Sequence, residues 1–254
     1  MRTRHVRTLT AIEAVAAIVG SLTLALFASS ALGGSTSGPK PYTSFSDSDL
    51  NGIDFSGGYF HLEDFEDNLL NVPGVSASAG APFAPGGITD SVDADDGATD
   101  GSGTAGHSFF SGSGASGITF TFDKLALGSL PTHAGIVWTD GLGTITFDAF
   151  DENGVSLGQI GPASEAGVFP DDNFSGGTAE DRFFGAQNDN GISKIFISNT
   201  DGGIEVDHLQ YGAVSAEPPP PPTGIPLPAS VWVGVAMFAM LAAAGGQLRK
   251  LAMG

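Results

Sequence analysis

Cysteine is absent from the 254-residue chain, and cationic side chains are scarce in its central part. Without cysteine the chain can form neither a disulfide nor a thiolate metal site, which by itself does not identify the compartment. Only three Lys or Arg residues lie between positions 41 and 217, against 27 Asp or Glu, so this region carries a net charge of −24. Such a surface repels phosphate backbones, so the sequence argues against nucleic-acid binding and favours divalent cations as partners.

The common catalytic motifs are also missing from this region. Its serines lack a Gly-x-Ser-x-Gly elbow, its glycine-rich runs lack the Gly-Lys-Ser/Thr ending of a phosphate loop, and its histidines lack zinc-ligand spacing. The many carboxylates could supply the acid and the nucleophile of a glycosidase, but their abundance alone has no specificity. We therefore expect a protein that is not an enzyme.

No window of the central region shows a helical period, whereas short alternating segments are frequent. Strands are expected over residues 117–123, 134–139, 144–150, 155–160, 192–199 and 204–211. The expected turns between them are Asp140-Gly141, Asp151–Gly154 and a hairpin loop at Thr200–Gly203. This pattern predicts an all-β fold, an antiparallel β-sandwich of the jelly-roll type. Its apolar residues, Trp138 included, are expected in the core, with a sugar platform as the alternative role of Trp138.

The N-terminus has the pattern of a secretory signal peptide. Arg2, Arg4 and Arg7 precede an apolar run over residues 16–28, and Ser29 and Ala31 stand at the small-residue positions of a cleavage site. The sequence therefore predicts a signal helix over residues 1–31 and export of the chain, with an uncleaved signal anchor as the alternative.

The C-terminus has the pattern of a membrane anchor behind a stiff stalk. Five prolines, Pro218–Pro222, favour polyproline II within a linker over residues 213–224. Residues 229–246 then carry no charge, which is near the lower limit of length for spanning a bilayer. Arg249 and Lys250 follow on the side where the positive-inside rule expects them.

Residues 225–254 resemble the PEP-CTERM class of sorting signals in its VPLPA variant. The motif reads Ile225, Pro226, Leu227, Pro228 and Ala229, and it precedes the apolar helix and the basic pair. The resemblance implies recognition by an exosortase, a membrane-embedded protease that cleaves near the motif and delivers the protein to the envelope or the extracellular matrix. Ile225 replaces the usual valine, and the basic end is shorter than the usual arginine run. A plain tail anchor is the alternative.

The sequence thus divides into a signal peptide (1–31), a polar lead (32–56), a β-sandwich (57–212), a linker (213–224) and the sorting signal (225–254). Blocks within the sandwich, such as Phe60–Asp67, Pro131–Asp140 and Gly203–Tyr211, resemble exported PEP-CTERM proteins of unassigned activity. This likeness implies export to the envelope or matrix, but it implies no enzymatic activity. We expect an exported, glycan-associated envelope or matrix protein. The alternatives are an extracellular polysaccharide hydrolase and a purely structural surface component.

Calcium is the cofactor that the acidic residues favour most. In carbohydrate-binding jelly rolls, a structural calcium ion often joins an acid of the first strand to an aspartate of the last. Asp207 stands in the last expected strand, and four acids open the sandwich, so we expect a calcium site formed by Glu63, Asp64, Glu66, Asp67 and Asp207. A salt bridge between Asp207 and Arg182 is the alternative account of this aspartate.

A second acidic cluster lies between the expected strands and comprises Asp90, Asp93, Asp95, Asp96 and Asp100. It does not match the calcium loop of an EF-hand, because Gly97 occupies an acidic position and the later glutamate is missing. An ion could bind there, but we expect a solvated acidic loop.

Overall fold

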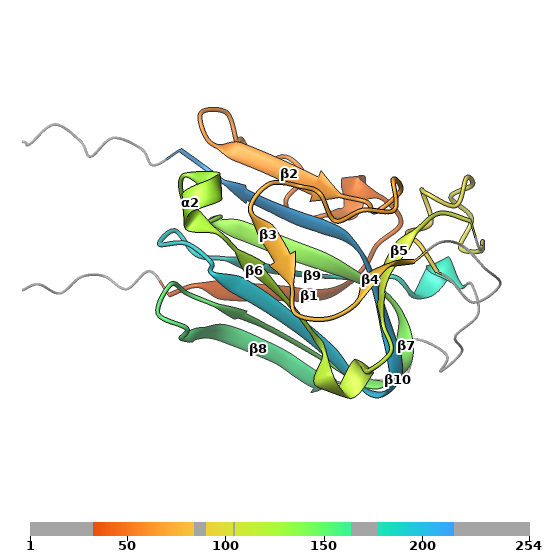
Figure 1. Ribbon diagram of the computed structural model, residues 1–254. Coiled ribbons are helices and arrows are strands. Elements are labelled where there is room, and N and C mark those ends of the chain that lie inside the picture. Colours follow the sequence, from red (N-terminus) through yellow and green to blue (C-terminus); the bar gives the residue numbers. More distant parts are fainter. Residues whose placement is uncertain (1–32, 84–89, 104, 164–176, 216–254) are drawn as a thin grey trace, which may run out of the picture. The chain divides into compact units, whose positions relative to one another are not determined.

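The computed structural model describes residues 33–83, 90–103, 105–163 and 177–215 (Figure 1). Within these ranges the strands pair antiparallel throughout, so the expected all-β, antiparallel architecture is confirmed. The strands are β1 (Ser35–Pro41), β2 (Tyr59–Glu63), β3 (Val75–Ala77), β4 (Ala81–Phe83), β5 (Ser108–Ser111), β6 (Ile118–Phe122), β7 (His133–Phe150), β8 (Ser156–Ala163), β9 (Arg182–Gln187) and β10 (Lys194–Ala213). The helices in these ranges are short: η1 (Phe45–Asp47), η2 (Gly114–Ser116), α2 (Lys124–Leu127) and η3 (Thr178–Glu180).

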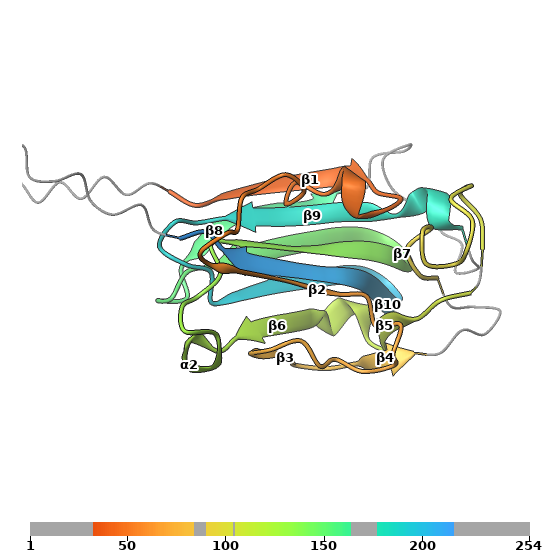
Figure 2. The same cartoon turned by 90° about the horizontal axis from the view of Figure 1, so that it is seen from above.

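The fold is organised by the long pair β7 and β10, which run beside each other through the middle of the structure (Figures 1 and 2). Their register extends from Lys194 opposite Phe150 to Gly212 opposite His133, with irregularities near the middle of both strands. Every other strand is attached to this pair, either directly or through one neighbour.

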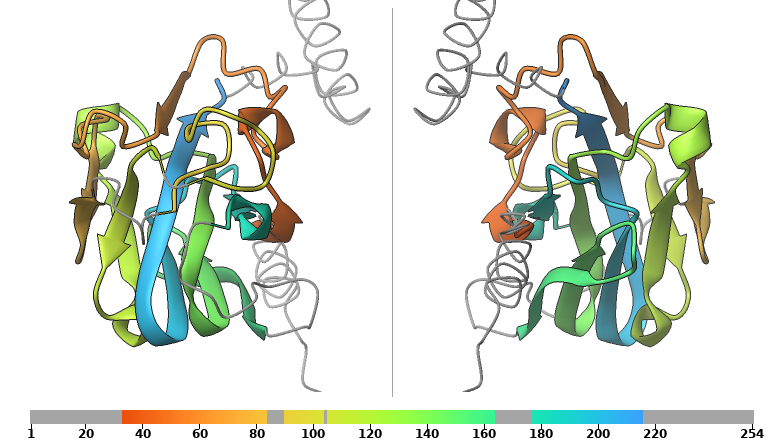
Figure 3. Two further views of the ribbon diagram at one scale, coloured as in Figure 1. Left: turned by 90° about the vertical axis from the view of Figure 1, so that its right-hand side faces the viewer. Right: turned by 90° about the vertical axis from the view of Figure 1, so that its left-hand side faces the viewer.

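Both strands bend over, as the end-on views in Figure 3 show. Gly141 and Gly202 have φ angles of 154° and 65°, which side chains rarely adopt. The side-chain amide of Asn199 donates hydrogen bonds to the carbonyls of Leu142 and Gly203, at 3.1 and 2.9 Å, and so joins the two strands at the bend.

Two of the expected turns are wrong, because the chain continues through this bend as strand. Asp140-Gly141 and Thr200–Gly203 lie inside continuous strands, so the predicted hairpin loop between residues 192–199 and 204–211 is wrong. An Asp-Gly pair supplies the positive φ angle that a hairpin turn needs, but a bulge in a continuing strand needs it as well. The third expected turn, Asp151–Gly154, is confirmed, because it joins β7 to its antiparallel partner β8.

The bend brings two parts of the sheet against a common core. On one side of it, residues 145–150 of β7 pair with β8 and residues 194–197 of β10 pair with β6. On the other side, residues 133–138 of β7 pair with β9, and the later part of β10 pairs with β5 and β2. Across the core, Phe147 stacks on Phe184 with ring centroids 5.6 Å apart, and Phe122 lies 4.9 Å from Tyr211.

A second, smaller core covers the outer face of β9, β7 and β10. It contains Val137 and Phe183 from the strands and Tyr42, Leu50 and Val92 from the segments that cross them. This part of the sheet is therefore buried on both faces, which explains why residues 134–140 show no alternation of polar and apolar side chains. Trp138 is fully buried in the main core, so its expected core position is confirmed.

The predicted polar lead contributes a strand. Within it, β1 pairs with β9, from Ser35 opposite Gln187 to Pro41 opposite Arg182. The signal helix over residues 1–31 and the apolar helix that follows Ala229 fall outside the described residues. In the part of the chain that the structure does describe, no helix has the length and apolarity needed to cross a bilayer.

Candidate functional site

Seven carboxylates are buried on the outer face of the β7–β10 pair, and we call them the acidic cluster. None is more than 8 % exposed; they are Asp90, Asp93, Asp140, Glu180, Asp181, Glu205 and Asp207. They are neighbours electrostatically, because the charge of Asp90 acts on the pKa of Asp181, and the charges of Glu180, Asp140 and Glu205 act on that of Asp90. Burying so many like charges is costly unless a cation or protons balance them.

The cluster forms because the segment that contains Asp90, Val92 and Asp93 crosses the strands, and its backbone N–H groups donate to carboxylates there. The backbone N–H of Asp90 donates to Glu205 (3.2 Å), and that of Val92 donates to Asp207 (2.9 Å). The N–H of Asp93 donates to Asp181 at 3.3 Å. The buried acids therefore hold the backbone of this segment in place, while Val92 packs into the second core.

Asp93 has enough partners to be explained as a structural residue. One of its oxygens accepts hydrogen bonds from the N–H groups of Asp100 and Gly101, at 3.3 and 3.0 Å, and from the hydroxyl of Thr178 at 2.7 Å. These bonds close the loop over residues 93–101 and attach it to η3.

At one end of the cluster, Asp207 lies beside a histidine. His208 sits at a bulge of β10 with a φ of 43°, its Nδ1 is 2.8 Å from the Tyr42 hydroxyl, and its Nε2 is 2.7 Å from Asp95. Burial alone lowers the pKa of His208, but the hydrogen bond to Asp95 and the charge of Asp207 outweigh it and raise that pKa. An imidazolium at this position balances part of the negative charge of both aspartates.

At the other end, carboxylate oxygens lack partners. Both oxygens of Asp90 and Oδ1 of Asp181 are buried without a hydrogen bond among the described residues; only the amide of Gly177 is close enough to lower the pKa of Asp90 slightly. Burial, and then the charges of neighbouring carboxylates, raise the pKa of Asp90 to about 8 and that of Asp181 well above its usual range. The guanidinium of Arg182 donates to the carbonyls of Ala179 and Asp181.

The four acids that open the predicted sandwich serve local roles. Glu63 accepts hydrogen bonds from three backbone N–H groups between residues 65 and 72. Asp64 and Asp67 each accept from the N–H two residues later, and Glu66 accepts from the N–H of His107. The register explains this separation, because Glu63 pairs with Leu209, whose side chain faces the main core, whereas Asp207 faces outwards.

Asp207 is joined instead by His208 and by Asp95, one of the five aspartates between residues 90 and 100. In the described ranges, the only three His or acidic groups with ligating atoms all within 4.8 Å of one another are Asp95, Asp207 and His208. The hydrogen bonds of Asp207 come from backbone N–H groups, so the structure does not show the alternative salt bridge to Arg182.

The expectation of a solvated loop over the second acidic cluster is wrong for two of its members. Asp90 and Asp93 are fully buried, because their segment docks on β10, whereas Asp100 is exposed as expected. Sequence reasoning also missed Glu205 as a site residue. Its signal was present, since Ile204 and Val206 alternate with Glu205 and Asp207, which puts both acids on one face of a strand.

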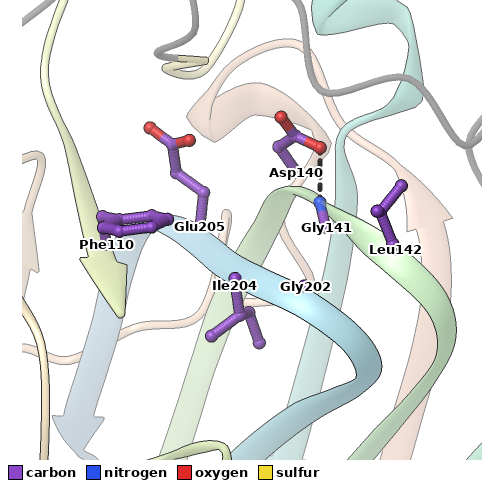
Figure 4. Close-up of a pocket in the computed structure, with 8 residues that line it drawn as sticks. Phe110, Asp140, Gly141, Leu142, Gly202, Ile204 and Glu205 are labelled. Carbon is purple, nitrogen blue, oxygen red and sulfur yellow. Dashed lines mark hydrogen bonds between the residues drawn. The ribbon is translucent and has the colours of Figure 1, made fainter. Parts of the chain in front are cut away.

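A hollow of about 250 Å³ lies beside the acidic cluster at the bend of β7 and β10 (Figure 4). Phe110, Leu142 and Ile204 supply its apolar lining, and Asp140 and Glu205 supply its carboxylates. Burial raises the pKa of Glu205 to about 7, although a hydrogen bond from the Ser108 hydroxyl opposes the shift.

The aromatic side of the hollow is accessible. Phe110 is 37 % exposed, and its ring lies 5.6 Å from that of Phe83, which is equally exposed. Gly203 lies directly under the Phe110 ring, because a Cβ atom built there would be 2.6 Å from it. The missing side chain at Gly203 thus allows the ring to lie close to β10.

No family model, curated protein or solved structure matches the chain.

Proposed function

We propose that this is an exported, non-enzymatic envelope or matrix protein whose β-sandwich associates with glycans. The sandwich assignment is supported by the two parts of the sheet that meet over one core on either side of the β7–β10 bend. The jelly-roll type is part of the proposal, together with delivery by the exosortase route that the motif Ile225–Ala229 favours.

The hollow beside Phe110 is the observation that carries glycan association. An exposed aromatic side chain suits the C–H face of a sugar ring, and Phe110, which is 37 % exposed, forms one side of the hollow. Its volume of about 250 Å³ is below the roughly 300–1,000 Å³ of most small-molecule sites, so it suits one sugar ring or a chain end. The high negative charge of the protein favours a neutral polysaccharide over an acidic one.

The same hollow supports a second candidate function, a polysaccharide hydrolase. Two carboxylates line it, and a glutamate with a pKa of about 7 suits a general acid. Binding is favoured because Asp140 and Glu205 are each only 4 % exposed, and because Glu205 already accepts hydrogen bonds from the Ser108 hydroxyl and the Asp90 N–H. A general acid needs direct contact with the glycosidic oxygen.

Co-sedimentation with insoluble neutral polysaccharides tests the proposal and separates it from the hydrolase. The wild-type chain should pellet with at least one polysaccharide and release no new reducing ends. Phe110→Ala should lose at least tenfold in affinity, whereas Leu125→Ala, which alters a 93 % exposed side chain on α2, should bind normally. Reducing ends that appear with the wild type and vanish with Glu205→Gln would establish the hydrolase instead.

A further inference from the structure

Three carboxylate oxygens of the acidic cluster, both of Asp90 and Oδ1 of Asp181, are buried without a hydrogen bond among the described residues. We propose that a divalent cation, calcium in the extracellular medium, binds between Asp90 and Asp181 and fastens the segment over residues 90–103 to the start of β9. This proposal goes beyond glycan association and does not depend on it. It also differs from the calcium site expected at Glu63–Asp67, because it uses other residues.

Unpartnered oxygens locate the ion. Asp90 is 0 % exposed with neither carboxylate oxygen hydrogen-bonded, and Oδ1 of the equally buried Asp181 is in the same condition. Buried polar atoms in proteins nearly always have a partner, so three such oxygens on two neighbouring side chains indicate a missing ligand. Among the charges that raise the pKa of Asp181 after burial, that of Asp90 has the largest effect, so the two carboxylates are neighbours.

Electrostatics separates this position from the other end of the cluster. There, His208 stands beside Asp95 and Asp207 and supplies positive charge. At the Asp90 end, the charges that act on the carboxylate come from Glu180, Asp140 and Glu205, and all of them are negative. Arg182 interacts electrostatically with Asp181 and Glu180, but the charges that act on Asp90 remain negative, so a cation is favoured between Asp90 and Asp181.

The donor atoms select a hard cation. Both side chains offer carboxylate oxygens, and the chain has no cysteine. Calcium takes six to eight oxygens in irregular geometry and completes its shell with backbone carbonyls and water, so two carboxylates suffice as anchors. A transition metal would prefer the imidazole of His208, whose nitrogens are already hydrogen-bonded to Tyr42 and Asp95.

An ion at this position would join two segments that are distant in the sequence. Asp90 lies in the segment that crosses β10, and Asp181 immediately precedes β9. Both segments already touch through Asp93, whose N–H donates to Asp181 and whose carboxylate accepts a hydrogen bond from the Thr178 hydroxyl. Binding to the folded state alone would stabilise this contact by mass action.

Thermal unfolding of the full chain in calcium and in chelator tests the proposal. At a hundredfold excess over the dissociation constant, calcium should raise the midpoint by roughly 5–10 °C. Asp90→Asn and Asp181→Asn should each lose most of that rise. In chelator they should unfold no earlier than the wild type, because each removes a buried negative charge that is surrounded by other carboxylates; a merely structural role would predict earlier unfolding.

Asp67→Asn is the matched control, since Asp67 is exposed and accepts hydrogen bonds only from Leu69 and Asn71 nearby, and it should keep the full calcium response. Three results would overturn the proposal. The first is a wild type indifferent to calcium and chelator, which leaves glycan association untouched. The second is an undiminished response in both Asn variants. The third is a response, to calcium or to zinc, that disappears only with Asp95→Asn or Asp207→Asn, which would move the ion to His208.

Discussion

The buried carboxylates should make the protein less stable as pH rises whenever divalent cations are chelated. Burial raises the pKa of Asp90 and of Asp207 to about 8, and that of Glu205 to about 7. A carboxyl group with a raised pKa binds its proton more tightly in the folded state than in the unfolded state. Its cost to folding is therefore absent below the unfolded pKa and grows until the pH passes the folded pKa.

The size of the effect follows from these shifts. One pKa unit is worth about 1.4 kcal/mol, so raising the pH from 5.5 to 8 costs about 3 kcal/mol each for Asp90 and Asp207, and about 2 kcal/mol for Glu205. The three groups titrate as one cluster, so their costs do not add fully, and we expect a total of about 5 kcal/mol. His208 acts in the same direction, because its raised pKa stabilises the fold only while the ring is charged.

Urea unfolding followed by far-ultraviolet circular dichroism, in chelator at pH 5.5, 7 and 8.5, measures this slope. Asp47, whose pKa is lowered by the Thr43 hydroxyl, loses its contribution only below about pH 4 and does not interfere. Saturating calcium should flatten the slope if it replaces the protons. A free energy of unfolding that stays constant or rises between pH 5.5 and 8.5 in chelator would refute the reasoning about buried charge.

Three further predictions concern backbone, ligand and processing. Gly117→Ala should lower the free energy of unfolding in urea by about 2–4 kcal/mol, because φ is 67° and a Cβ would lie 2.5 Å from the Phe196 ring. Gly154→Ala, at a φ of 77° with open space around it, should lower it by about 1 kcal/mol. Equal losses in the two variants would contradict the steric argument. Gly203→Ala should displace Phe110 and weaken polysaccharide binding while the melting midpoint shifts little; unchanged binding would remove Phe110 from the site. Mass spectrometry of secreted protein should find chains that end near Ala229, and only full-length, membrane-bound chains would contradict sorting.

The sequence predicted segments of β6, β7, β8 and β10, but it predicted neither β1 to β5 and β9 nor most of the connections. Alternation over residues 118–122 identified β6, and the Asp151–Gly154 turn identified the β7–β8 hairpin. The glycines at 141 and 202 gave a local signal that fits a turn or a bulge equally well. The long-range pairing of β7 with β10 decides between them, and nothing within either segment encodes that pairing.

The chemistry of the site could be predicted from the sequence, but the set of residues that form it could not. The cost of burying Asp207 was visible from its apolar neighbours in the sequence. Its partner was not, because the docking of residues 90–93 on β10 depends on hydrogen bonds between residues 115 positions apart. For the same reason Asp90 looked like a solvated loop residue, although it is fully buried.

Calorimetric titration of the full chain with a neutral oligosaccharide, taken from whichever polysaccharide retains the protein, tests the central claim most directly. We predict saturable binding of one oligosaccharide per chain that is lost in Phe110→Ala, kept in Leu125→Ala, and accompanied by no shortening of the recovered oligosaccharide. Binding that is indifferent to Phe110→Ala, or an oligosaccharide recovered as shorter fragments, would contradict a non-enzymatic glycan site in the hollow.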